Sequence, residues 1–73
     1  MTNTELLERE IAYSGIKKGK IAETLGISYT SLRRKMDNTV DFKADEVLKL
    51  CKVLGINSAK KRDAIFFNEN VGE

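Results

Sequence analysis

The sequence predicts a small all-α domain, a compact bundle of about five short helices. Three observations support this fold class. The 73-residue chain contains no proline and is rich in residues that favour helices. Its apolar residues recur at helical spacing in short segments, and three of these segments are followed by a Gly-Ile pair, as expected where helices end. Apolar residues make up 41% of the chain, which is enough for a globular core.

The first helix is expected over residues 4–14. Thr2 together with Glu5, or Thr4 itself, can cap its N-terminus, because a hydroxyl oxygen can accept a hydrogen bond from an amide of the first turn. Gly15 is the natural end of this helix, since glycine is common just beyond the last helical turn.

The second and third helices are expected over residues 18–25 and 29–36, separated by a turn in which Ser28 can cap the third helix. Two helices that cross over a tight turn need a small residue at the crossing, a glycine in the turn and apolar side chains around it. The residues that meet these needs are Ile21, Ala22, Leu25, Gly26, Ile27 and Leu32. The pattern indicates a helix-turn-helix; an ordinary helix corner without a ligand is the alternative.

The fourth and fifth helices are expected over residues 44–54 and 59–67. Asn38 lies in the turn before the fourth helix and can adopt a left-handed conformation. Asn57 or Ser58 can cap the fifth helix.

Residues 1–67 are therefore expected to form one helix-turn-helix domain, followed by a short C-terminal tail, residues 68–73. The end of the fifth helix carries three large apolar residues in a row, Ile65, Phe66 and Phe67. A domain this small has room for only one or two of them in its core. Either these side chains close the core, or they form a surface for a second subunit or another protein.

The net charge of +2 is unevenly distributed along the chain. Residues 17–35 carry six basic side chains against Glu23 alone, a net charge of +5, whereas residues 1–16 and 36–73 are slightly acidic. A cationic block in an otherwise balanced chain points to a surface that meets an anion. A solvated helix face is the alternative.

Composition also excludes several kinds of site. With no histidine and one cysteine, the chain can form neither a zinc site of the usual type nor an intrachain disulfide. Gly15 and Gly19 are not followed by the Gly-Lys-Ser/Thr ending of a phosphate-binding loop. We therefore expect no enzyme, no catalytic residue, no metal and no cofactor, and a buried, inert Cys51. A polar N-terminus and the absence of a long apolar stretch predict no membrane partner and a cytoplasmic location.

The segment from Gly15 to Ser28 (GIKKGKIAETLGIS) resembles the lambda Cro/repressor type of helix-turn-helix family, as does the segment from Phe42 to Ile56. The resemblance covers about residues 3–57. It implies a five-helix domain that acts as a Cro-like regulator in the lysis–lysogeny switch of a phage, inside the bacterial host cell. Such domains bind double-stranded operator DNA, commonly as homodimers.

The resemblance also assigns roles to residues. The family reads bases with side chains early on the second helix of the motif, which here are Tyr29, Thr30, Arg33 and Arg34. Arginine can bind guanine through two hydrogen bonds, and Thr or Tyr can contact the methyl group of thymine. The candidates for phosphate contacts are Lys17, Lys18, Lys20, Lys35 and Lys43. Lys35 occupies a position that is usually apolar, so Met36 is expected to pack in its place.

A second function is compatible with the same residues. Short members of the family also resemble antirepressors, which bind a phage repressor protein and block or alter its DNA binding. The low net charge and Tyr29, which replaces a polar uncharged residue, favour this alternative, because an exposed aromatic ring can anchor a protein contact. The contact would involve the same basic face, or the end of the chain around Phe66 and Phe67.

Overall fold

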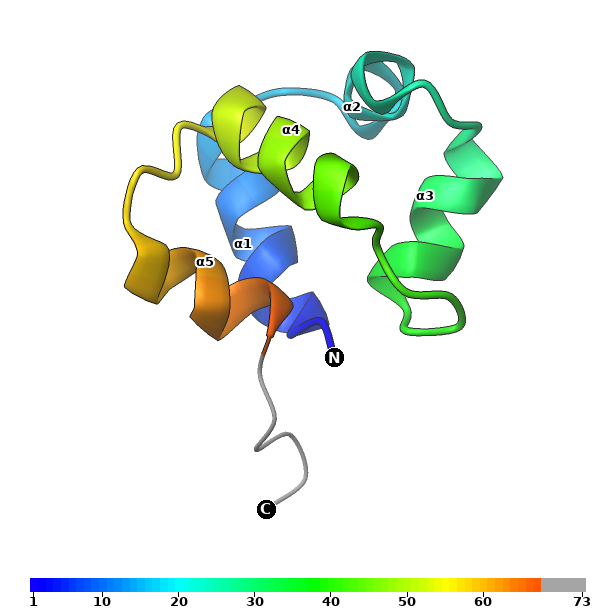
Figure 1. Ribbon diagram of the computed structural model, residues 1–73. Helices are drawn as coiled ribbons and strands as arrows, with labels where there is room; N and C mark the ends of the chain where they lie inside the picture. Colours follow the sequence, from blue (N-terminus) through cyan, green and yellow to red (C-terminus); the bar gives the residue numbers. More distant parts are fainter. Residues whose placement is uncertain (68–73) are drawn as a thin grey trace.

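Five helices and no strand make up residues 1–67, the part of the chain that the computed structural model describes. They are α1 (Thr4–Ser14), α2 (Lys18–Leu25), α3 (Tyr29–Met36), α4 (Ala44–Leu54) and α5 (Ala59–Phe66) (Figure 1). The all-α fold class is confirmed, and the last helix ends one residue earlier than expected. The predicted tail, residues 68–73, lies outside the described residues. None of the five helices is long and apolar enough to cross a membrane.

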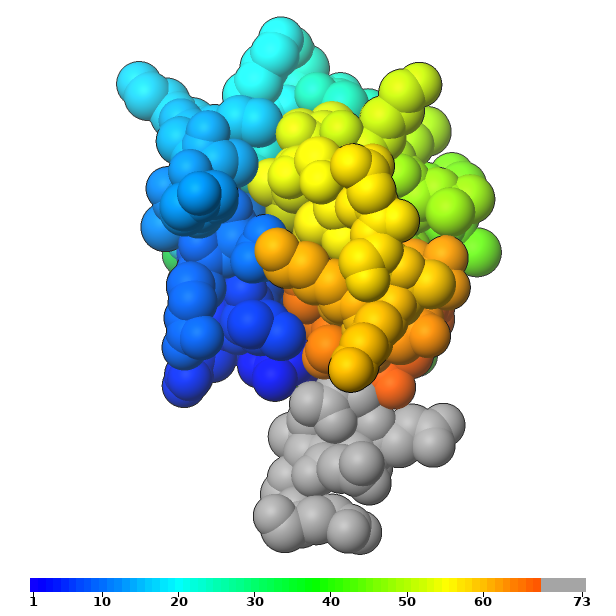
Figure 2. All heavy atoms as spheres, turned by 90° about the vertical axis from the view of Figure 1, so that its left-hand side faces the viewer, coloured from blue at the N-terminus to red at the C-terminus, as the bar shows by residue number. Residues whose placement is uncertain are grey.

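The helix α4 occupies the middle of the bundle. It packs against α1 and α2, while α3 packs on α2 and α5 packs on α1. In Figure 1, α2 and α3 lie to one side of α4 and α5 lies to the other. Figure 2 shows α1 and α5 side by side on the face turned to the viewer. The pair α2–α3 and the helix α5 therefore lie at different ends of the molecule.

Every helix contributes to a single core. The largest side chains that are fully buried are Leu7, Ile21, Leu32, Met36, Leu50 and Ile65. Burial of one such side chain stabilises the fold by about 1.5–3 kcal/mol. In the long connection between α3 and α4, Phe42 packs edge-to-face on Phe66, with the ring centroids 5.5 Å apart.

The N-terminal residues form hydrogen bonds with the end of α3 and the turn that follows it. The predicted caps of α1, Thr2 or Thr4, are wrong: Asn3 is the N-cap, and its side-chain oxygen accepts a hydrogen bond from the amide three residues later. Thr2 and the Asn38 side chain exchange two hydrogen bonds of 2.8 Å, while the Thr4 hydroxyl donates to the carbonyl of Met36. These polar groups thus make tertiary contacts across more than thirty residues of sequence. Asn38 adopts the expected left-handed backbone, with a φ of 65°.

Two serine caps and one glycine define the α2–α3 connection and the start of α5. Ser28 and Ser58 accept hydrogen bonds from the amides three residues later, at 3.0 and 3.3 Å, as predicted. Gly26 has a φ of 73°, a backbone conformation that is energetically unfavourable for residues with a Cβ atom. This glycine ends α2 three residues before α3 begins. The local sequence therefore determines how the chain turns between α2 and α3.

The end of α5 divides its three large apolar residues between core and surface. Ile65 and Phe66 are buried, whereas Phe67 is 53% exposed. Of the two alternatives predicted for this segment, closure of the core holds for Ile65 and Phe66, so neither residue forms a surface for another protein. Phe67 lies just beyond the last helical residue and is the only one of the three that remains exposed.

This division predicts unequal effects of truncation. Phe66→Ala should lower the free energy of unfolding by about 3 kcal/mol, because it leaves a cavity beside Phe42, whereas Phe67→Ala should cost less than about 1 kcal/mol. Urea denaturation followed by circular dichroism measures both values. Phe66→Leu keeps most of the side-chain volume, so its loss in free energy of unfolding should lie between those of the two alanine variants. Equal losses for the two alanine variants would contradict the assignment of Phe66 to the core.

Candidate nucleic-acid interface

The helix α3 presents its polar side chains on one exposed face. Leu32 and Met36 are almost fully buried and fix the rotation of the helix about its axis. Residues three and four positions apart lie on the same side of a helix. The four predicted base-reading residues, Tyr29, Thr30, Arg33 and Arg34, are therefore neighbours on the outward side, and all four are exposed.

Tyr29 and Arg33 form the centre of this face. Tyr29 is 47% exposed and lies one helical turn before Arg33. The Tyr29 hydroxyl raises the pKa of the Arg33 guanidinium, and the carboxylates of Asp37 and Glu8 raise it further. Arginine is charged at any physiological pH, so this shift does not change the charge that Arg33 presents.

The start of α2 carries the three lysines predicted to contact phosphate, and they differ in their surroundings. Lys17 is exposed and makes no ion pair among residues 1–67. Lys18 is partly buried, and its ammonium lies 2.8 Å from the carboxylate of Glu8 on α1. Lys20 is exposed and pairs with Glu23 at 3.0 Å. Of the three, Lys17 is the most available to an external anion.

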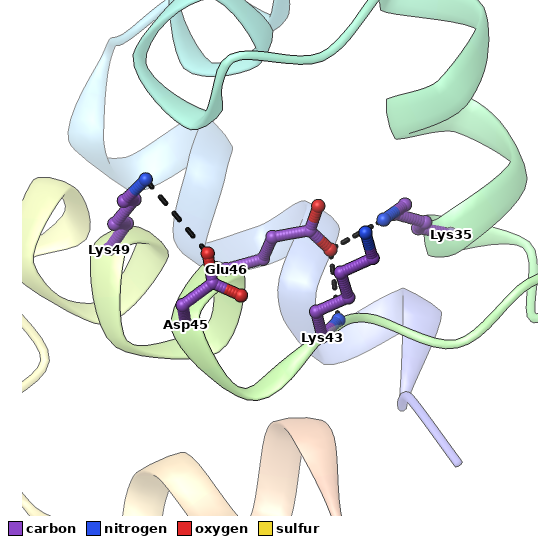
Figure 3. Close-up of polar contacts among 5 residues, drawn as sticks. All are labelled: Lys35, Lys43, Asp45, Glu46 and Lys49. Atoms are coloured by element: carbon purple, nitrogen blue, oxygen red, sulfur yellow. Dashed lines mark hydrogen bonds and ion pairs between the residues drawn. The ribbon is translucent and has the colours of Figure 1, made fainter.

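Lys35 is not available to phosphate, so its prediction as a phosphate contact is wrong. Its side chain is 7% exposed, and the ammonium group donates a hydrogen bond to Oε1 of Glu46, itself 6% exposed (Figure 3). The same oxygen accepts the backbone N–H of Lys43 at 2.8 Å. Met36 is also buried, so both residues at the end of α3 face inward. Lys35 is therefore half of a buried ion pair at the position where the resemblance implies an apolar residue.

The charge of Glu46 is stabilised where it lies. Burial by itself raises the pKa of this carboxyl, but hydrogen bonds from Lys35 and from the Lys43 backbone outweigh burial and lower the pKa below its ordinary value. Glu46 is thus ionised at neutral pH, and its contribution to stability is lost only as the pH falls below the ordinary range of a glutamate. The exposed pair of Asp45 and Lys49 in Figure 3, 4.0 Å apart, gives little stability by comparison.

Lys43 remains an exposed candidate for a phosphate contact. It is the N-cap of α4, where its backbone rather than its side chain completes the cap with Glu46. Lys43 therefore lies in the connection before α4, and not on α2 or α3 with the other cationic candidates.

Sequence reasoning missed two features. The first is Glu8, whose contact with Lys18 joins two different helices and leaves no mark on either helix alone. The second is a shallow apolar hollow between α4 and α5, lined by Ala44, Val47, Leu48, Arg62 and Phe67. Leu48 is 62% exposed and lies one residue away from the buried face of α4, so helical spacing could have identified it.

Neither a metal cluster nor a reactive thiol stands out in residues 1–67. No group of three or more potential metal ligands lies together among these residues. Cys51 is free and buried, as expected, and burial raises the pKa of its thiol despite the opposing effect of Arg62. A thiol with a raised pKa is a poor nucleophile.

The buried pair predicts a non-additive response to mutation. Lys35→Met and Glu46→Gln should each lower the free energy of unfolding by about 3 kcal/mol, because each leaves an uncompensated buried charge. The double variant should recover most of the loss, since Gln can still accept the Lys43 N–H. Urea denaturation at pH 7 tests this expectation, and additive losses would contradict it. Acidification should reduce the difference in free energy of unfolding between the wild type and Glu46→Gln, because Glu46 of the wild type becomes protonated.

Comparison of the chain with protein-family models, curated proteins and solved structures found no match. The contacts and charges of α2 and α3 therefore carry the functional assignment.

Proposed function

We propose that the chain is a helix-turn-helix transcription regulator that binds double-stranded operator DNA, as Cro-like proteins do in phage lysis–lysogeny switches. In this proposal α3 enters the major groove and the start of α2 meets the backbone. One observation carries it: α3 buries Leu32, Lys35 and Met36 and exposes a continuous stripe of Tyr29, Thr30, Arg33 and Arg34.

The stripe has the chemistry to read base edges. Arg33 and Arg34 can each donate two hydrogen bonds to O6 and N7 of a guanine, and Thr30 and Tyr29 can contact the methyl group of a thymine. The N-terminal part of a recognition helix lies closest to the bases. Tyr29 and Thr30 are the first two residues of α3, so they suit this position.

The lysines at the start of α2 are suited to phosphate. Lys17 and Lys20 are exposed, and Lys18 is partly exposed. The first amides of a helix add a partial positive charge that favours an anion in the same place. Contacts of this kind fix the orientation of a protein on the duplex, while base contacts supply sequence selectivity.

A second copy of the chain is a further proposed partner. The hollow around Leu48 and Phe67 is apolar and lies between α4 and α5, so two copies that meet there leave α3 free in each. Two α3 helices could then read two half-sites of one operator.

An antirepressor remains a second candidate, and the exposure of Tyr29 favours it. A half-exposed aromatic ring beside Arg33 is a typical centre of a protein interface. The partner would be a phage repressor that presents an acidic surface to this face. The sequence also predicts a repressor contact at the end of the chain around Phe66 and Phe67. Because Phe66 is buried, only Phe67 is exposed for that contact. Co-purification with the repressor but no binding to DNA would favour this function.

The DNA-binding proposal predicts different effects for two cationic residues. A duplex selected from a random library serves as the operator. Arg33→Ala should weaken its binding by about 1–3 kcal/mol and relax selectivity at one base pair. Lys17→Ala should weaken binding to all duplexes by a similar factor and reduce the slope of log affinity against log salt by about one. Fluorescence anisotropy over a salt series measures both.

Lys60→Ala is the matched control for Lys17→Ala, since it removes the same charge from an exposed position on α5. It should change the salt slope little. If no duplex is selected, and none is bound at low salt, the proposed function is wrong.

The dimer proposal predicts that Phe67→Asp raises the dissociation constant of the dimer at least tenfold, because it places a charge in an apolar contact. Tyr13→Asp is the control: Tyr13 is 91% exposed on α1, away from the hollow. Sedimentation equilibrium gives the dissociation constants. Equal association of the two variants would place the dimer contact elsewhere, and a wild-type chain that is monomeric at every concentration would exclude it.

A further inference from the structure

The ion pair between Glu8 and Lys18 joins α1 to the proposed phosphate-binding end of α2. The carboxylate oxygen and the ammonium nitrogen are 2.8 Å apart. The side chains are 45% and 28% exposed, whereas the pairs Arg9–Glu5 and Lys20–Glu23 lie within single helices and are more than 65% exposed throughout. Glu8 thus holds Lys18 in a partly buried position between two helices.

Glu8 also affects the proposed base-reading face. The pKa of Arg33 is raised first by the Tyr29 hydroxyl, then by Asp37, and Glu8 adds to this effect. The contact of the Glu8 carboxylate is with Lys18 on α2, and its effect on Arg33 is the smallest of those that raise the pKa. A carboxylate paired with Lys18 occupies the ammonium group that a DNA phosphate would otherwise bind.

We propose that Glu8 sets the affinity of this face for a polyanion, because its carboxylate competes with DNA phosphate for Lys18. The inference rests on the proposed DNA-binding function and names a residue that limits it. To bind a phosphate, Lys18 must leave Glu8 without a partner.

Counterions turn this competition into a measurable quantity. Each phosphate that a lysine neutralises releases counterions, and log affinity falls with log salt by about 0.9 per contact. A carboxylate left unpaired attracts a cation from solution and offsets that release. Lys18 should thus add little to the salt slope while Glu8 is present, and close to a full contact once Glu8 is neutral.

The test compares Glu8→Gln with Asp63→Asn. Both replace a carboxylate with an amide of the same shape and change the net charge by the same amount. Asp63 lies on α5, where it pairs with Arg62 at 3.2 Å, at the end of the molecule away from α2. Affinity for a random-sequence duplex of about 20 base pairs is measured by anisotropy across a salt series, with circular dichroism to verify the fold.

Glu8→Gln should bind roughly three- to tenfold more tightly at about 0.1 M salt, and its salt slope should be steeper by up to about 0.9. Asp63→Asn should change both much less. In a Lys18→Gln background most of the gain from Glu8→Gln should disappear, because the competition acts through Lys18. A gain equal to that of Asp63→Asn, or one that persists without Lys18, would overturn the proposal.

Retention on immobilised heparin separates the failure of this inference from that of the proposed function. If the wild type binds heparin but no duplex, the DNA-binding function is wrong, while later elution of Glu8→Gln than of Asp63→Asn still supports competition at Lys18. Identical elution of the two variants, or no retention of any of them, would refute the role of Glu8.

Discussion

A single carboxylate oxygen of Glu46 holds together the part of the molecule on which the proposed function depends. It accepts one hydrogen bond from the Lys35 ammonium at the end of α3 and another from the Lys43 amide at the start of α4. Because Lys35 points inward together with Leu32 and Met36, the opposite side of α3 must point outward. A buried ion pair is not a strong source of stability compared with apolar packing. Its geometry, however, is restrictive, and here it orients a helix.

The same interaction reduces the number of cationic side chains that are free to meet an anion. The net charge of +5 over residues 17–35 counts Lys35, whose charge is cancelled inside the molecule, and Lys18, which Glu8 partly neutralises. Lys17, the N-cap of α2, and Arg33 and Arg34 on α3 remain without an ion pair among the described residues. The cationic face is thus narrower than the sequence indicates, and on α3 its unpaired charges, Arg33 and Arg34, lie in the last turn of the helix.

Local signals explain what the sequence could predict. Serine caps and glycine ends lie within a few residues of the helix termini that they define, so four helices begin and end as expected and the fifth differs by one residue. The errors arise from contacts between distant parts of the chain. Thr4 resembles a cap but bonds to the end of α3, and Lys35 resembles a surface lysine until Glu46, eleven residues later, is placed beside it. No local pattern marks Glu8 as the partner of Lys18. The outward stripe of α3 was predictable because helical periodicity alone places it opposite the apolar residues Leu32 and Met36, and the pair of Lys35 and Glu46 adds to the same orientation.

A face with few unpaired cations has a consequence for selectivity. Non-specific binding to DNA depends almost entirely on phosphate contacts, whereas specific binding adds contacts to bases. When a lysine is already paired with a carboxylate of the protein, the affinities for specific and for non-specific DNA fall by the same factor. The ratio between these two affinities is therefore preserved. The base contacts then account for a larger share of the remaining binding free energy. Dissociation from incorrect sites also becomes faster, since affinity changes within one interface are expressed mainly in the dissociation rate. If the domain binds DNA as proposed, its net charge of only +2 requires that selectivity come from Arg33, Arg34 and their neighbours on α3 rather than from total charge.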